Sequence, residues 1–166
     1  MRQVKFDGTP MELAGKAVEV GQKAPDFTAV KQDMSEMSLS DTKGSVRVLS
    51  VVPSIDTPVC AMQTRFFNKE ATDLGDVKIL TISMDLPFAK GRFCAAEGIE
   101  NVEVLSDHRT AEFGEKYGFL MKDLRLLARG IVVVDQDDVI RYVEYVDEVT
   151  HDVDFDAALK AVKELL

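Results

Sequence analysis

The stretch VRVLSVVPSIDTPVC, residues 46–60, decides the fold that this sequence predicts. Residues 46–52 are almost all apolar and rich in β-branched side chains, which is typical of a strand buried on both faces of a sheet. Pro53 ends that strand. From about residue 59 to residue 74 the apolar side chains recur at helical spacing, at Met62, Phe66, Phe67, Ala71 and Leu74. The stretch therefore predicts a buried strand, a short loop and an amphipathic helix with Cys60 in its first turn.

Strand and helix patterns alternate along the rest of the chain. Further strands are expected at residues 77–83, 102–105, 131–134 and 140–146, and further helices at 88–96 and 111–117. A last helix has the apolar stripe Phe155, Leu159, Val162 and Leu166. The first twenty residues read as a hairpin that turns at Asp7-Gly8 and returns through residues 12–15. This order predicts an α/β sandwich whose central sheet is mixed, because residues 131–146 form a second hairpin.

Length and composition are those of one ordinary domain, spanning residues 1–166. A formal charge of −9 would repel nucleic acid and anionic membrane surfaces. The longest apolar runs are far shorter than the roughly 18 residues of a membrane span, and the first residues lack the apolar core of a signal peptide. We therefore expect a cytoplasmic protein that binds neither nucleic acid nor a membrane.

Cys60 is placed where a thiolate is favoured. The first turn of a helix that follows a buried strand offers free backbone N–H groups and the positive end of the helix dipole. That dipole contributes ~2 kcal/mol at most, and a tenfold change in the thiolate population takes ~1.4 kcal/mol, so a strongly reactive Cys60 needs a second cation or a set of hydrogen bonds. Arg129, just before the strand expected at 131–134, is better placed than Arg125 to supply it. The alternative is that Arg129 caps loop carbonyls or faces solvent.

Four segments of the chain resemble the peroxiredoxin family. Residues 53–60, PSIDTPVC, have its P-x-x-x-T-x-x-C arrangement, in a form similar to that of the thiol peroxidase subfamily, the atypical two-cysteine peroxiredoxins. Residues 21–27, GQKAPDF, resemble the G-x-x-A-P-D-F segment of the family. Cys94 lies in KGRFC, where the subfamily has its second cysteine, and LARG at 127–130 resembles the segment with the active-site arginine. The four segments follow the family's order across nearly the whole chain.

The resemblance implies a thioredoxin-like three-layer sandwich and an enzyme that reduces hydrogen peroxide and organic hydroperoxides, with thioredoxin as electron donor. Cys60 would be the peroxidatic cysteine, with Thr57, Arg129 and the Cys60 backbone N–H binding the sulfur or the peroxide oxygens, and Pro53 shielding the sulfur from water. Cys94 would resolve the Cys60 sulfenic acid as an intramolecular disulfide. The resemblance also implies a bacterial homodimer.

The two cysteines are also compatible with other functions. A redox-responsive binding protein would use the Cys60–Cys94 disulfide to reshape a surface for a partner, whereas a protein disulfide oxidoreductase would want a C-x-x-C motif, which is absent. No cofactor or metal is expected, since His108 and His151 have no metal-ligand spacing. Asp56 is interpreted as a helix cap or the partner of a nearby cation.

A disulfide between the two cysteines requires their Cα atoms to come within about 7 Å. Cys60 and Cys94 fall in different predicted helices. We therefore expect the first turn of the Cys60 helix, the Cys94 helix or both to unwind locally during each cycle.

Overall fold

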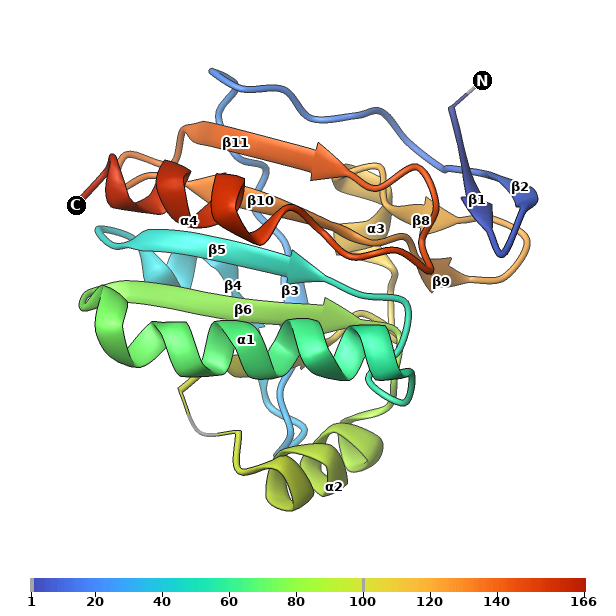
Figure 1. Ribbon diagram of the computed structural model, residues 1–166, viewed down its shortest axis with the longest axis horizontal. Helices are drawn as coiled ribbons and strands as arrows, with labels where there is room; N and C mark the ends of the chain where they lie inside the picture. Colours follow the sequence, from blue (N-terminus) through green and yellow to red (C-terminus); the bar gives the residue numbers. More distant parts are fainter. Residues whose placement is uncertain (1, 100) are drawn as a thin grey trace.

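The computed structural model describes residues 2–99 and 101–166, and a seven-stranded mixed sheet forms its centre (Figure 1). The strand order across this sheet is β11-β10-β5-β6-β7-β3-β4. The parallel strands are β5 (Val46–Val51), β6 (Val77–Ser83) and β7 (Glu103–Ser106). The antiparallel strands are β10 (Gly130–Val134) and β11 (Ile140–Tyr145) at one edge, and β3 (Thr28–Val30) and β4 (Glu36–Ser38) at the other.

Helices connect and cover these strands. The α-helices are α1 (Pro58–Leu74), α2 (Pro87–Glu97), α3 (Glu112–Lys116) and α4 (Phe155–Lys163), and a 3-10 helix spans Leu39–Thr42. Two short antiparallel pairs lie outside the main sheet: β1 (Gln3–Phe6) with β2 (Thr9–Glu12), and β8 (Leu120–Met121) with β9 (Leu126–Leu127). The predicted α/β class, mixed sheet and N-terminal hairpin are confirmed. In the described part of the chain, none of the helices is long and apolar enough to cross a membrane.

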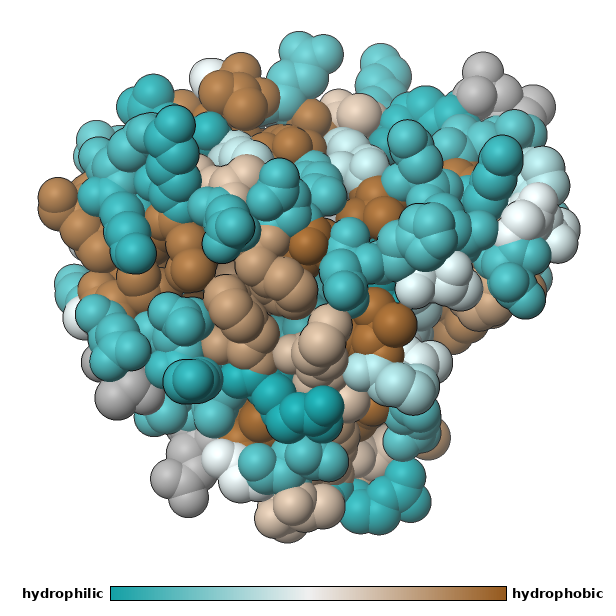
Figure 2. Space-filling view, in the orientation of Figure 1, coloured by the Kyte–Doolittle hydropathy of each residue, from teal (hydrophilic) through white to brown (hydrophobic). Residues whose placement is uncertain are grey.

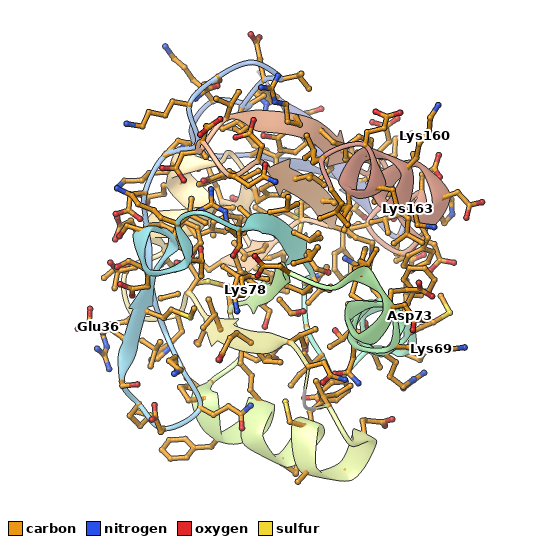
Figure 3. All side chains as sticks on the ribbon, turned by 90° about the vertical axis from the view of Figure 1, so that its left-hand side faces the viewer. Glu36, Lys69, Asp73, Lys78, Lys160 and Lys163 are labelled. Atoms are coloured by element: carbon orange, nitrogen blue, oxygen red, sulfur yellow. The ribbon has the colours of Figure 1, made fainter. Side chains whose placement is uncertain are left out.

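The central strands are buried on both faces, as their apolar runs predicted. Val46 and Val48 of β5 belong to a buried cluster with Phe67 of α1 and Val162 of α4. Leu49 of β5 belongs to a second cluster on the other face, where Val51, Phe27, Phe113 and Tyr117 also pack. Figure 1 shows α1 and α4 on the same face of the sheet. Figure 3 shows the exposed side chains of these helices, Lys69, Asp73, Lys160 and Lys163, on the side opposite Glu36 of β4.

The surface that α1 and α4 present to solvent is mostly hydrophilic, with smaller apolar patches between the polar side chains (Figure 2). Two residues expected in buried stripes lie on the surface instead. Met62 is 39% exposed, and its neighbours Gln63 and Thr64 are buried, because the buried arc of α1 here faces hydrogen-bond partners. Leu166 is 60% exposed, since α4 ends at Lys163. The side chain of Ala71 lies outside the described residues.

Most predicted boundaries hold within two residues, but several elements were not foreseen. The returning strand of the first hairpin is Thr9–Glu12 rather than residues 12–15. Strands β3, β4, β8 and β9 are two or three residues long and have no clear sequence period. They form because neighbouring segments offer backbone partners, which no local pattern reports.

Candidate active site

Cys60 is the third residue of α1 and is completely buried. Thr57 is the N-cap residue, in extended backbone conformation, and its Oγ1 accepts a hydrogen bond from the Cys60 N–H at 3.3 Å. Pro58 follows at the first helical position, where its missing N–H costs nothing. The cap therefore uses the N–H that the resemblance assigned to a peroxide oxygen. It fixes the start of α1 so that the thiol lies in the first turn.

Arg129 meets the sulfur of Cys60. Its Nη2 donates to Cys60 Sγ at 3.0 Å, its Nη1 to Gln63 Oε1 at 3.0 Å, and its Nε to the carbonyl oxygen of Val149 at 2.7 Å. The guanidinium is only 2% exposed. Arg125 is exposed and lies in the left-handed region at φ 52, so it takes no part in this site. Of the alternative interpretation of Arg129, the bond to a loop carbonyl is confirmed at Val149, whereas exposure to solvent is wrong.

The pairing of β10 with β5 explains the position of Arg129. Gly130 pairs with Val51, so Arg129 lies beside the point where β5 ends and the loop to Cys60 begins. A Cβ on Gly130 would lie 2.1 Å from the Glu144 carbonyl oxygen, so a larger residue would push the strands apart at this place. Glycine here lets β10 and β11 approach closely and holds Arg129 in position.

Gln63 is a site residue that the sequence interpretation missed. It lies one helical turn after Cys60, is 1% exposed, and accepts from Arg129 through Oε1 while its Nε2 donates to Ser50 Oγ at 2.8 Å. Residues three apart on a helix share a face. A polar residue three positions after the cysteine, in the phase where burial is expected, was the available signal.

A second missed residue, Asp85, holds the loop before Cys60. Its carboxylate accepts hydrogen bonds from Ser54 Oγ at 2.8 Å, the Ile55 N–H at 2.9 Å and Ser83 Oγ at 2.6 Å. Pro53 is buried at the start of this loop. Asp85 thereby ties the loop that carries the Thr57 cap to the segment between β6 and α2.

Asp56 precedes the cap and does not itself cap α1. Its carboxylate lies 3.6 Å from Arg92 Nη2 of α2, and both side chains are largely exposed. Of the two interpretations offered for Asp56, partner of a cation is the one confirmed. Such an exposed ion pair contributes little to stability.

Cys94 lies in α2 and is 7% exposed. Gln32, from the turn between β3 and β4, donates from Nε2 to Cys94 Sγ at 3.2 Å. Burial raises the pKa of the Cys94 thiol. Both cysteines are free thiols, and they belong to one apolar cluster whose other members are Val52, Ile55, Phe93, Ile99 and Val104. The structure therefore places both thiols in the same buried region, on separate helices.

Within residues 2–99 and 101–166, no group of three or more His, Cys, Asp or Glu side chains is arranged to hold a metal ion. Nδ1 of His108 lies 2.8 Å from Ser106 Oγ. The chemistry of the site follows from its donors: the Cys60 sulfur lies in the first turn of α1 and accepts a guanidinium N–H, an arrangement suited to a nucleophilic cysteine.

Comparisons with known proteins show which proteins this chain resembles. The model of the family described as Redoxin matches residues 19–161. A curated thiol peroxidase of Oceanobacillus iheyensis is 57% identical over 159 residues, which cover 96% of this chain and 97% of that protein. A thiol peroxidase of Bacillus subtilis is 50% identical over 100% of this chain and 99% of its own length.

Solved structures give the same picture. A peroxiredoxin-like protein from Aquifex aeolicus superposes with a TM-score of 0.94 at 38% identity, over 100% of this chain and 98% of that one. A thiol peroxidase from Chromobacterium violaceum has a TM-score of 0.87 at 21% identity, over 98% and 95% of the two chains, and so supports the fold alone.

Proposed function

This chain belongs to the redoxin family, and from that membership and its full-length similarity to thiol peroxidases we propose that it reduces hydrogen peroxide and organic hydroperoxides to water and alcohols. Its fold is the thioredoxin-like sandwich of that family. One observation carries the proposal to particular atoms: Arg129 Nη2 donates to Cys60 Sγ at 3.0 Å, in the first turn of α1.

In the first step the Cys60 thiolate attacks the terminal oxygen of the hydroperoxide. The S–O bond forms, the O–O bond breaks, and the leaving alkoxide or hydroxide takes a proton. Negative charge moves from sulfur to the leaving oxygen, so fixed donors that serve both atoms lower the barrier. We assign that role to Arg129, whose Nη2 donates to the sulfur, and to Thr57, whose hydroxyl donates to the Ser54 carbonyl oxygen at 3.3 Å in the reduced site and has to turn from it toward the peroxide. Buried Pro53 limits the access of water to the sulfur.

In the second step Cys94 attacks the Cys60 sulfenic acid, and water leaves as the disulfide forms. Capture prevents further oxidation to sulfinic acid. Thioredoxin then reduces the disulfide. The presence of both thiols in one apolar cluster supports this pairing.

The setting of the enzyme is part of the same proposal. We place the single domain of residues 1–166 in the bacterial cytoplasm, where two free thiols stay reduced, and expect it to act as a homodimer.

The experiment that tests this function follows NADPH consumption in a mixture of the protein, thioredoxin, thioredoxin reductase and cumene hydroperoxide. Steady consumption is expected from the natural chain, and its loss is expected in Cys60→Ser. Cys94→Ser should still consume one equivalent of peroxide while losing turnover with thioredoxin. A natural chain that is oxidised once and never recycled would favour the redox-responsive binding protein instead.

A further inference from the structure

Lys90 is a completely buried lysine that the reaction described above does not use. Lysine is among the residues least often found inside a protein. The Nζ atom of Lys90 donates a hydrogen bond to the carbonyl oxygen of Leu105 in β7. No carboxylate in the described part of the chain forms an ion pair with this ammonium group. A buried ammonium group of this kind acts most strongly on the polar side chains nearest to it.

The helix geometry points from Lys90 to Cys94. The two residues are four apart on α2, and both are buried. Side chains at positions i and i+4 lie on the same face of a helix, and each tilts toward the N-terminus, so that of Cys94 leans toward Lys90. The acceptor of Lys90, Leu105, follows Val104, which is a member of the apolar cluster around Cys94.

A second donor reaches Cys94 from another part of the fold. Gln32 Nε2 lies 3.2 Å from Cys94 Sγ. The Gln32 side chain passes over Gly91, where a Cβ atom would lie 3.7 Å from its Oε1. The sulfur of Cys94 therefore has a neutral donor on one side and a buried ammonium one helical turn away.

Burial leaves the proton of Lys90 mobile near neutral pH. Burial lowers the pKa of Lys90 to about 7, and the negative charges of Asp85, Asp107 and Cys94 oppose that effect only in part. Both aspartates come from the segments packed against α2, one before the helix and one after β7.

The charges around Cys94 act in two directions. Burial raises the pKa of its thiol and Glu103 of β7 adds to that rise, whereas Lys90 and Gln32 lower it. The two donors thus oppose the burial that would otherwise keep Cys94 protonated and unreactive.

We propose that Lys90 is the proton acceptor of the resolving step, and that its buried Nζ, together with Gln32, stabilises the Cys94 thiolate that attacks the Cys60 sulfenic acid. This inference rests on the proposed function of Cys94. The Cys94 proton passes to neutral Nζ, the Cys60–Cys94 S–S bond forms, and the S–O bond of the sulfenic acid breaks. The hydroxide that leaves takes up the proton that Nζ accepted and becomes water, so Nζ is neutral again, Cys94 is oxidised and the Cys60 sulfenic sulfur is reduced.

The test measures Cys94 directly, without peroxide. In Cys60→Ser the chain has Cys94 as its one remaining thiol, so the ultraviolet absorbance of the thiolate as a function of pH reports Cys94 alone. Added to this variant, Lys90→Met and Lys90→Gln should each move the midpoint upward, because each removes the contribution of Lys90 that lowers the pKa of Cys94. Gln32→Leu should move it upward by less.

Arg92→Met is the matched control for charge. Arg92 carries the same charge on the same helix, two residues before Cys94, but its side chain is 73% exposed. Its removal should leave the midpoint unchanged. Midpoints in Lys90→Met, Lys90→Gln and Gln32→Leu that are the same as in Cys60→Ser alone would overturn the inference. An upward shift in Arg92→Met as large as that in Lys90→Met would also overturn it.

Folding is controlled separately. Lys90→Gln keeps an N–H donor for Leu105, and Gln32 lies in an exposed turn, so at least these variants should show the circular dichroism of the natural chain. A structural role alone would change stability without moving the titration.

Kinetics with Cys60 restored separate this inference from the proposed function. In Lys90→Gln, formation of the sulfenic acid after one equivalent of peroxide should keep its rate, while disulfide formation should slow about tenfold at neutral pH and recover at high pH. A slowdown that is equal at all pH values would overturn the role of Lys90. Turnover that survives in Cys94→Ser would instead remove Cys94 from the mechanism, and the titration would still decide whether Lys90 acts on its thiol.

Discussion

Arg129 Nη2 lies 3.0 Å from Cys60 Sγ, although 69 positions separate the two residues. The sheet makes this contact: Gly130, the first residue of β10, pairs with Val51, so Arg129 just before β10 lies beside the end of β5. The other guanidinium donors are bound to Gln63 and Val149. A donor fixed on both sides does not need to reorganise as charge develops, which is the condition for strong electrostatic catalysis.

Arg129→Lys should slow sulfenic acid formation about a hundredfold or more. A single ammonium cannot reach Cys60, Gln63 and Val149 together, so at least one of these partners loses its donor. Stopped-flow measurement of the first oxidation step checks this, with Arg125→Lys as the control, since Arg125 is exposed and away from the site. A rate in Arg129→Lys within threefold of the natural one would contradict the assigned role.

Gln63→Leu should slow the same step by about tenfold and lower the free energy of unfolding by about 1–3 kcal/mol. The substitution leaves Arg129 Nη1 and Ser50 Oγ buried without their shared partner. Ser50→Ala is the matched control, because it removes the other partner of Gln63 and leaves the bond to Arg129 intact. We expect a normal oxidation rate in Ser50→Ala, and similar rates in the two variants would mean that Gln63 does not act through Arg129.

Thr57→Val should weaken both the helix and the reaction. Its Oγ1 accepts the Cys60 N–H, so Thr57→Val loses the N-cap and about 1 kcal/mol of stability, while Thr57→Ser keeps the hydroxyl. Urea unfolding and the rate of peroxide reduction should therefore both be close to natural in Thr57→Ser. A slow Thr57→Ser with normal stability would show that the methyl group, and not the cap, matters for the reaction.

The sequence predicted the parts of the site that local patterns encode. The doubly buried β5, the start of α1 and the arginine before β10 all follow from apolar runs and their punctuation. The thiolate argument also required a cation near Cys60, and the register of β10 on β5 provides one.

What the sequence could not predict are residues whose burial depends on a distant partner. Gln63 lies in the helical phase where burial is expected, but its partners Arg129 and Ser50 come from other segments of the chain and cannot be read from that phase. Lys90 resembles an exposed helix residue, because the sequence does not show that its Nζ donates to the carbonyl oxygen of Leu105. Periodicity assigns polar side chains to solvent, and only tertiary hydrogen bonds reverse that assignment.

Glu148 should make the docking of the N-terminal hairpin sensitive to acid. Its carboxylate accepts the N–H groups of Asp7 and Gly8 at 3.0 and 2.8 Å. The Gly8 bond above all, with the bonds from Thr150 and Asp7, lowers the pKa of Glu148 from 4.5 to about 2. A depressed carboxyl pKa stabilises the folded state above pH 4.5, and that stability is lost as the pH falls toward 2.

Amide hydrogen exchange in β1 and β2 measures this effect. Glu148→Gln should exchange faster than the natural chain at neutral pH, and the difference should shrink as the pH falls through the acid range. Asp147→Asn, at the exposed neighbouring position, is the control and should behave like the natural chain. A difference that is constant with pH would show that the charge of Glu148 is not what holds the hairpin.

Disulfide formation should loosen the two helices that hold the cysteines. In the reduced protein Cys60 is held by the Thr57 cap and Arg129, and Cys94 by its position in α2 and by Gln32. The disulfide needs Cα atoms within about 7 Å, and each sulfur must give up its hydrogen-bond partner to form it. We therefore expect faster hydrogen exchange over residues 53–64, residues 87–98 or both after one equivalent of peroxide, with β5 and β10 unchanged.

Cys94→Ser treated in the same way reports the sulfenic acid without the disulfide and should keep its protection in α2. Equal exchange in the reduced and disulfide forms would show that the cysteines meet without unwinding, and the barrier to resolution would then lie in the chemistry at Cys94.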